Sequence, residues 1–142
     1  MQAKGGQPHD LSEILGSDFV AEDQFRFETN TGTVCQEFSV KGSPMKVEIF
    51  TLSEDAHDQQ RFARRVEQAM FGTTVPFPSP EDVIVWKLRW ARPKDLDDIR
   101  GVILVQRQEG DLDWDYIRHW CQQHETLAKL ETLIASLPEI RH

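Results

Sequence analysis

The sequence predicts a small α+β domain, in which a small mixed or antiparallel sheet with a hairpin is followed by C-terminal helices. Two runs rich in strand-forming residues, Thr33 to Val40 and Met45 to Leu52, lie close together in the first half of the chain. From Ser79 onward, apolar residues recur at helical spacing. A length of 142 residues is enough for one hydrophobic core. We therefore expect a flexible N-terminus over residues 1–9 and a single domain over residues 10–142.

The first predicted element is a short helix. Asp10 and Glu13 have the spacing of a capping box, in which each side chain accepts a hydrogen bond from the other residue's backbone. Leu11, Ile14 and Leu15 supply an apolar stripe behind this cap. The helix is expected to end at Gly16, because glycine readily adopts the left-handed conformation that follows many helices.

A hairpin is predicted next, because Lys41, Gly42, Ser43 and Pro44 are turn formers between the two strand-like runs. Side chains alternate between the two faces of a strand. In the second run, Met45, Val47 and Ile49 therefore share one face, and Lys46, Glu48 and Phe50 share the other. This pattern places the carboxylate of Glu48 in the middle of a strand, on its more polar face.

An amphipathic helix is expected over Asp58 to Met70, because Phe62, Val66, Ala69 and Met70 recur at helical spacing. Three arginines, Arg61, Arg64 and Arg65, lie among these apolar residues. They favour a solvated helix face over an anion-binding patch. The segment Val75 to Phe77 is expected to be a short extended connection.

The strongest helix start lies at Ser79, with Pro80 in the first turn and Glu81 and Asp82 near the positive end of the helix dipole. This helix is predicted to reach about Trp90. The next is expected over residues 94–108, with Leu96, Ile99, Val102 and Ile103 facing inward. Asp113 caps a further predicted helix, stapled by Leu112 and Ile117, and a last one is expected around Leu127, Leu130 and Ile134.

Composition excludes several functional classes. The net charge of −8 argues against a nucleic-acid-binding module, because such modules neutralise phosphates with basic surfaces. No apolar run approaches the length that spans a bilayer, so we expect no membrane segment. Two widely separated cysteines, Cys35 and Cys121, give neither a disulfide framework nor a paired metal site. We therefore expect a cytoplasmic protein with two free thiols.

Four segments carry a resemblance to a known family: Val47–Phe50, Ser79–Trp90, Arg92–Ile99 and Leu112–Ile117. In their order and spacing they resemble small nucleotidyltransferase-fold proteins, of the minimal or abortive-infection type. The resemblance covers about residues 10–125. It implies an incomplete nucleotidyltransferase-like domain, corresponding to the part that follows the family's Gly-Ser and Asp-x-Asp motif.

The resemblance also implies a metal-binding position. Members of the family hold two Mg²⁺ ions with an Asp-x-Asp pair and a third acid on a neighbouring strand, and they transfer a nucleotide by attack on its α-phosphate. Glu48 matches the third acid, although the family more often has aspartate there. The paired acids have no match, and the segment that would carry them is expected before residue 10. Glu48 is thus the one candidate metal ligand.

Further candidate site residues follow from the resemblance. Lys87, Asp95 and Asp98 match catalytic-type positions, and Arg92 and Lys94 match nucleotide-binding positions. Each has a structural alternative. Lys87 could cover the rings of Trp86 and Trp90, and the two acids could complement the dipole of the helix they begin.

One other cluster invites a metal-site interpretation. His119, Cys121 and His124 lie close in sequence, but their spacing does not direct three ligands to one point. Cys121 is better explained as a core residue.

Three functional hypotheses remain. The first is a nucleotidyltransferase-like protein without the paired carboxylates, inactive as a transferase and acting by binding, with a homodimer covering the uncovered sheet edge. The second is an active metal-dependent nucleotidyltransferase with other acids. The third is a regulatory or antitoxin-like module whose acidic surface binds a basic protein partner. Divalent-metal and nucleotide binding that vanishes in Glu48→Gln is expected under the second hypothesis, so nucleotide titration with and without Mg²⁺ separates it from the others.

Overall fold

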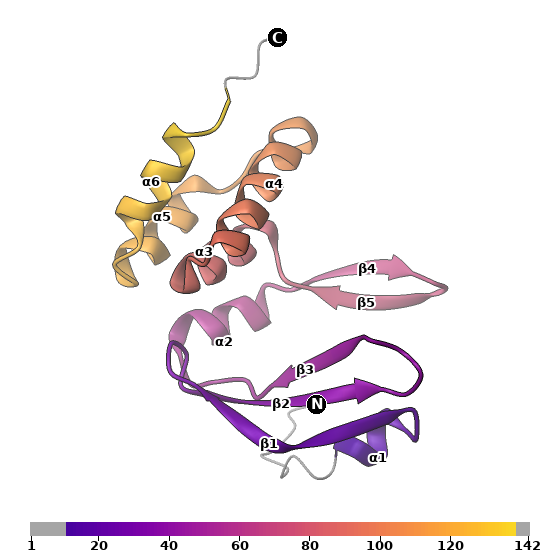
Figure 1. The fold of residues 1–142 in the computed structure, drawn as a ribbon. Helices are drawn as coiled ribbons and strands as arrows, with labels where there is room; N and C mark the ends of the chain where they lie inside the picture. The colour runs from indigo at the N-terminus through magenta and orange to yellow at the C-terminus, as the bar shows by residue number, and fades with distance from the viewer. Residues whose placement is uncertain (1–10, 139–142) are drawn as a thin grey trace. The chain divides into compact units, whose positions relative to one another are not determined.

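The computed structural model of the chain describes residues 11–138 and confirms an α+β fold (Figure 1). The described residues form six helices and two small antiparallel sheets. The chain divides into two compact units, Met1–Asp58 and Gln59–His142. The flexible segment expected over residues 1–9 lies outside the described residues, and the single domain expected over residues 10–142 stays a prediction. None of the described helices is long and apolar enough to cross a bilayer.

The first unit contains a short helix and a three-stranded sheet. Helix α1 (Leu11–Leu15) precedes strands β1 (Phe19–Glu28), β2 (Thr33–Val40) and β3 (Lys46–Phe50). The strands are antiparallel and follow the order β1-β2-β3. The short helix and the β2–β3 hairpin confirm the sequence predictions, although Asp10, the expected cap, lies outside the described residues. Gly16, with φ of 87°, follows α1 in the left-handed conformation.

Strand β1 was not predicted from the sequence. Its central residues Glu22, Asp23 and Gln24 are polar and exposed, so the alternation typical of a half-buried strand is lost there. The pairing with β2 also shifts register between Ala21 and Phe25, which is an irregularity of the β-bulge type. Pairing with β2 therefore decides the strand conformation here, and it brings Arg26 opposite Cys35.

Strand β3 has the two faces that the sequence predicts. Val47 and Ile49 are half-buried, whereas Lys46, Glu48 and Phe50 are exposed. The neighbouring strand contributes Phe38 and Cys35, which are buried.

The second unit begins within helix α2 (Ala56–Ala63), which spans the division between the units. Strands β4 (Val66–Met70) and β5 (Thr73–Phe77) follow and form an antiparallel hairpin. The helix expected over Asp58 to Met70 is therefore wrong in its second half, and the extended connection at Val75 to Phe77 is part of a strand. The reason lies in the turn: Phe71 and Gly72 both have positive φ, 49° and 76°, as a two-residue turn of type I′ requires.

Four helices complete the second unit: α3 (Pro80–Trp90), α4 (Pro93–Glu109), α5 (Trp114–Gln123) and α6 (Leu127–Ala135). The predicted caps are confirmed, since Ser79 accepts from the backbone of Asp82 and Asp113 accepts from that of Tyr116. The core of the unit consists of buried residues from all four helices and from the loop before α5: Ile84, Val85, Leu88, Ile99, Ile103, Leu112, Ile117, Cys121, Leu130 and Leu133. Burial of this core holds the corner between α3 and α4 in place. Most of the candidate site residues lie at that corner.

Candidate functional site

Glu48, the candidate metal ligand, is held by an arginine of the neighbouring unpredicted strand. On the three-stranded sheet, Nη2 of Arg26 donates a hydrogen bond to Oε1 of Glu48. The same nitrogen lies 3.5 Å from Oε2 of Glu37, which stands directly opposite Glu48 in the β2–β3 register. Lys46 pairs with the other carboxylate oxygen of Glu37. The hydrogen bond to Glu48 is the main cause that raises the pKa of Arg26, and the bond from Lys46 lowers the pKa of Glu37.

This arrangement balances two carboxylates with two cations. A divalent ion at Glu48 would compete with the Arg26 guanidinium for the negative charge of the carboxylate, and it would also need further oxygen ligands. Among the described residues, no group of three His, Cys, Asp or Glu side chains at ligand distance includes Glu48. The sheet thus places Glu48 in an exposed ion-pair cluster, which differs from the clustered acids of a two-metal centre.

Lys87, Asp95, Asp98 and Arg92 come together where α3 meets α4. Nζ of Lys87 donates to Oδ2 of Asp98 at 2.7 Å and lies 3.6 Å from Oδ1 of Asp95. Nε and Nη2 of Arg92 donate to the two oxygens of Asp95 at 2.6 and 3.2 Å. The ammonium of Lys87 is therefore held by two carboxylates. The structural alternative, in which Lys87 covers tryptophan rings, did not include this contact.

Asp95 is the centre of this ion-pair group, and it is 1% exposed. The side-chain hydrogen bond from Arg92 is the main cause that lowers the pKa of Asp95, and the backbone N–H of Arg92 and the charge of Lys87 act in the same direction. Asp95 also accepts a hydrogen bond from the backbone N–H of Arg92 at 3.2 Å and lies in the first turn of α4. Lys94 lies exposed one residue before it.

Asp82 is the centre of a second polar network that sequence reasoning missed. The carboxylate is fully buried. It accepts hydrogen bonds from the Ser79 hydroxyl at 2.7 Å and from the Tyr116 hydroxyl at 2.6 Å, and Nε of Arg64 lies 3.5 Å away. Burial is the main cause that raises the pKa of Tyr116, and the bond to Asp82 adds to it. In the sequence Asp82 looks like an ordinary acid in a first helical turn, and its partner Tyr116 is far along the chain.

Two of the arginines around α2 pack against aromatic rings of the second unit. The guanidinium carbon of Arg64 lies 3.9 Å from the centre of the Tyr116 ring, and that of Arg61 lies 5.0 Å from the centre of the Trp86 ring. Arg64 also lies 3.9 Å from Oε2 of Glu81. These cation–π contacts favour a packing role over the solvated face that the sequence indicated.

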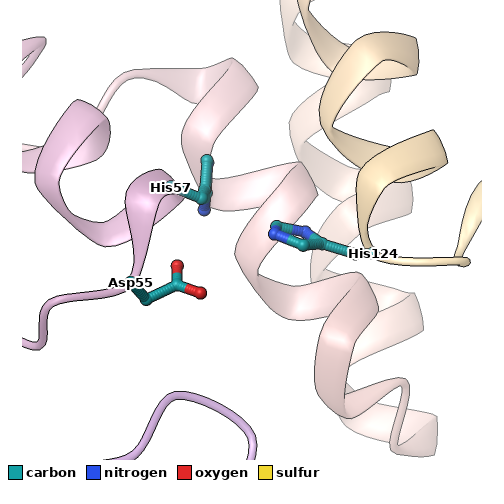
Figure 2. Close-up of side chains that lie close together, drawn as sticks. All are labelled: Asp55, His57 and His124. Atoms are coloured by element: carbon teal, nitrogen blue, oxygen red, sulfur yellow. The ribbon is translucent and has the colours of Figure 1, made fainter.

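Asp55 directly precedes α2, and His57 is the second residue of that helix (Figure 2). Oδ1 of Asp55 accepts from the backbone N–H of Asp58 at 3.1 Å, which is the geometry of a helix cap. His124, drawn in the same figure, is the C-terminal cap residue of α5, and its ring centre lies 5.7 Å from that of Trp120. The sequence had indicated His124 only as part of a poorly spaced cluster.

The buried cysteine in that cluster also has a structural explanation. Cys121 is fully buried in the helical core, as predicted, and burial raises the pKa of its thiol.

The structure therefore brings four of the six predicted site residues into one ion-pair group, with Lys94 beside it. Glu48 belongs to the sheet of the first unit, where its neighbours are Arg26 and Glu37. Comparisons with known proteins give no relative, since no protein-family model, curated protein or solved structure matches the chain.

Proposed function

We propose that the chain is a nucleotidyltransferase-like protein that lacks the paired catalytic carboxylates and acts by binding a nucleotide instead of transferring it. The observation that carries this proposal is the pairing of Glu48 with Arg26. Transfer by the two-metal mechanism requires carboxylates that are open to Mg²⁺. A carboxylate that is bonded to a guanidinium on an exposed sheet face is poorly suited to that task.

The residues assigned to nucleotide binding are Arg92 and Lys94. Both are exposed and lie at the start of α4, so their cationic groups can meet phosphate oxygens from solvent. Asp95 fixes the guanidinium of Arg92 through two hydrogen bonds. Lys87 is engaged with Asp98 and Asp95, and we assign it a positioning role at this corner.

We also place this binding in the cytoplasm. Cys35 and Cys121 are free and buried. Free thiols are typical of proteins in reducing compartments.

A transfer assay tests the catalytic half of the proposal. The full chain is incubated with each nucleoside triphosphate and Mg²⁺, and release of pyrophosphate is followed. We expect no release above a protein-free control. Pyrophosphate release that disappears in Glu48→Gln would contradict the proposal and support an active transferase with unrecognised acids.

A calorimetric titration tests the binding half. We expect nucleoside triphosphate to bind with the same affinity with and without Mg²⁺, and equally well to the wild type and to Glu48→Gln. Lys94→Gln should weaken binding. Lys129→Gln is the matched control, because Lys129 is an exposed lysine on α6 and its replacement changes the net charge equally. Absence of binding, or equal weakening by both lysine variants, would contradict the assignment.

A further inference from the structure

The β4–β5 hairpin carries most of its large apolar side chains on one face. Register pairs Val66 with Phe77 and Gln68 with Val75, and alternation places Met70 on the same face. The side chains of this face are incompletely covered, since Val66 and Met70 are 41% and 39% exposed. A two-stranded hairpin is marginally stable alone. The exposed apolar face therefore indicates a surface that a partner covers.

The two edges of the hairpin differ in their capacity to accept another strand. In a two-residue hairpin, Met70 and Thr73 beside the turn form a hydrogen-bonded pair, and the pairs then alternate. Pro76, paired with Glu67, falls in a non-bonded pair, so its nitrogen faces the outer edge of β5. Because proline has no N–H, it blocks strand addition there.

The outer edge of β4 is open to pairing. By the same alternation, the backbone groups of Glu67 and Ala69 point outward from β4. Among the described residues, this sheet contains β4 and β5 alone. Figure 1 shows the hairpin extending away from the helices of its unit. The edge thus presents two donors and two acceptors beside an apolar face.

We propose that two copies of the chain associate through β4, as antiparallel strands centred on Gln68. This register pairs all five residues of the strand with the partner. Glu67 then stands opposite the partner's Ala69 in a hydrogen-bonded pair, and the twofold axis repeats that pair. Val66 stands opposite the partner's Met70, so the apolar faces of the two hairpins join into one four-stranded face.

In this register, β4 places no like charges directly opposite each other. Glu67 is its one charged residue, and in this register it meets an alanine instead of a second glutamate. Like charges directly opposite each other would destabilise the pairing. A second copy can therefore pair with this edge without direct like-charge repulsion, although the whole chain is acidic, with a net charge of −8.

Analytical ultracentrifugation of the full chain over a range of concentrations tests the proposal. We expect the mass of two chains at high concentration and of one chain on dilution. Ala69→Pro removes an outward N–H from the edge of β4 and should give a monomer. Thr74→Pro is the matched control, because Thr74 pairs with Ala69 and its N–H faces the other edge, so this variant should remain dimeric. Far-UV circular dichroism of both variants checks that the fold is retained.

Charge variants at the same position test the register without proline. Ala69→Glu places a glutamate opposite the partner's Glu67 and should raise the dissociation constant roughly tenfold. Ala69→Lys places an opposite charge there and should leave the dimer intact or tighten it. A wild type that sediments as one chain at every concentration would overturn the proposal. It would also be overturned if both proline variants, or both charge variants, dimerised equally.

Discussion

The hydroxyl of Tyr116 donates a hydrogen bond to Oδ1 of the buried Asp82 at 2.6 Å and thereby joins the first turn of α5 to the first turn of α3. The other oxygen of Asp82 accepts from Ser79 and lies near Arg64. A buried carboxylate is costly unless it is paired and hydrogen-bonded. The donors of this network therefore compensate the buried charge of Asp82, which lies in the first turn of α3.

Replacement of Tyr116 by phenylalanine is expected to destabilise the fold. The ring and its contact with Arg64 remain, but Asp82 loses one donor, which costs about 2 kcal/mol of unfolding free energy. Urea denaturation followed by tryptophan fluorescence measures the change. Thr132→Ala is the control, because Thr132 donates to Ala128 on an exposed helix face and its loss should have little effect. Equal stability of Tyr116→Phe and the wild type would refute the structural role of this bond.

Asp95 should make stability depend on pH in the acidic range. Its folded-state pKa lies below the ordinary value of 3.8, so the ionised carboxylate stabilises the fold above that pH. The contribution is lost as pH falls through the lowered folded-state pKa. Asp95→Asn should therefore be less stable than the wild type near neutral pH, and the difference should shrink as the pH falls below about 4.

Denaturant midpoints measured over a pH series check this prediction. Asp97→Asn provides the control on the same helix, because it removes the same charge from an exposed pair with Arg100. Its difference from the wild type should be small throughout. A difference for Asp95→Asn that stays constant from neutral to acidic pH would contradict the linkage.

Phe71 is expected to lower the stability of the β4–β5 hairpin. It is 98% exposed and has a φ of 49°, so it combines the strain of a left-handed residue with no burial of its ring. Phe71→Asn gives the Asn-Gly turn favoured for this geometry and should stabilise the chain by about 0.5–1 kcal/mol. Thermal unfolding at dilute concentration measures the gain.

A substitution at the neighbouring glycine should change the stability in the opposite direction. Gly72 has a φ of 76°, and an added Cβ would meet no atom within 4 Å. Gly72→Ala should therefore destabilise the hairpin through backbone strain alone, by about 1 kcal/mol. A loss of stability in Phe71→Asn would show instead that the phenylalanine ring makes a contact that stabilises the fold.

Both thiols should be unreactive in the native protein. Cys35 is 2% exposed and Cys121 is fully buried, and burial is the main cause that raises both thiol pKa values. Because the thiolate is the reactive form, labelling with an aromatic disulfide should be slow at neutral pH and rapid in denaturant. The Cys35→Ser and Cys121→Ser variants assign each phase. Rapid native labelling of Cys121 would mean that the helical core opens locally.

The candidate site could be predicted in part. The sequence pointed to Lys87, Asp95 and Asp98 because they match positions of one family, and local chain geometry does bring them together at the α3–α4 corner. It also named Glu48 and placed it correctly on a strand. It could not supply Arg26, because that residue lies in a strand whose polar centre hides the pattern. The tertiary pairing of β1 with β2 is what brings the guanidinium to Glu48.

The sequence by itself determined the elements whose signals are local. Ser79 and Asp113 begin helices with their own side chains, and the turn formers before Lys46 set the β2–β3 hairpin. Tertiary structure alone decided where distant partners meet. A helix-like spacing at Val66 to Met70 gave way to a hairpin because pairing with β5 and a left-handed turn outweigh weak helical propensity. Asp82 and Tyr116, which are 34 positions apart in the sequence, became partners only because the helical core packs α3 against α5.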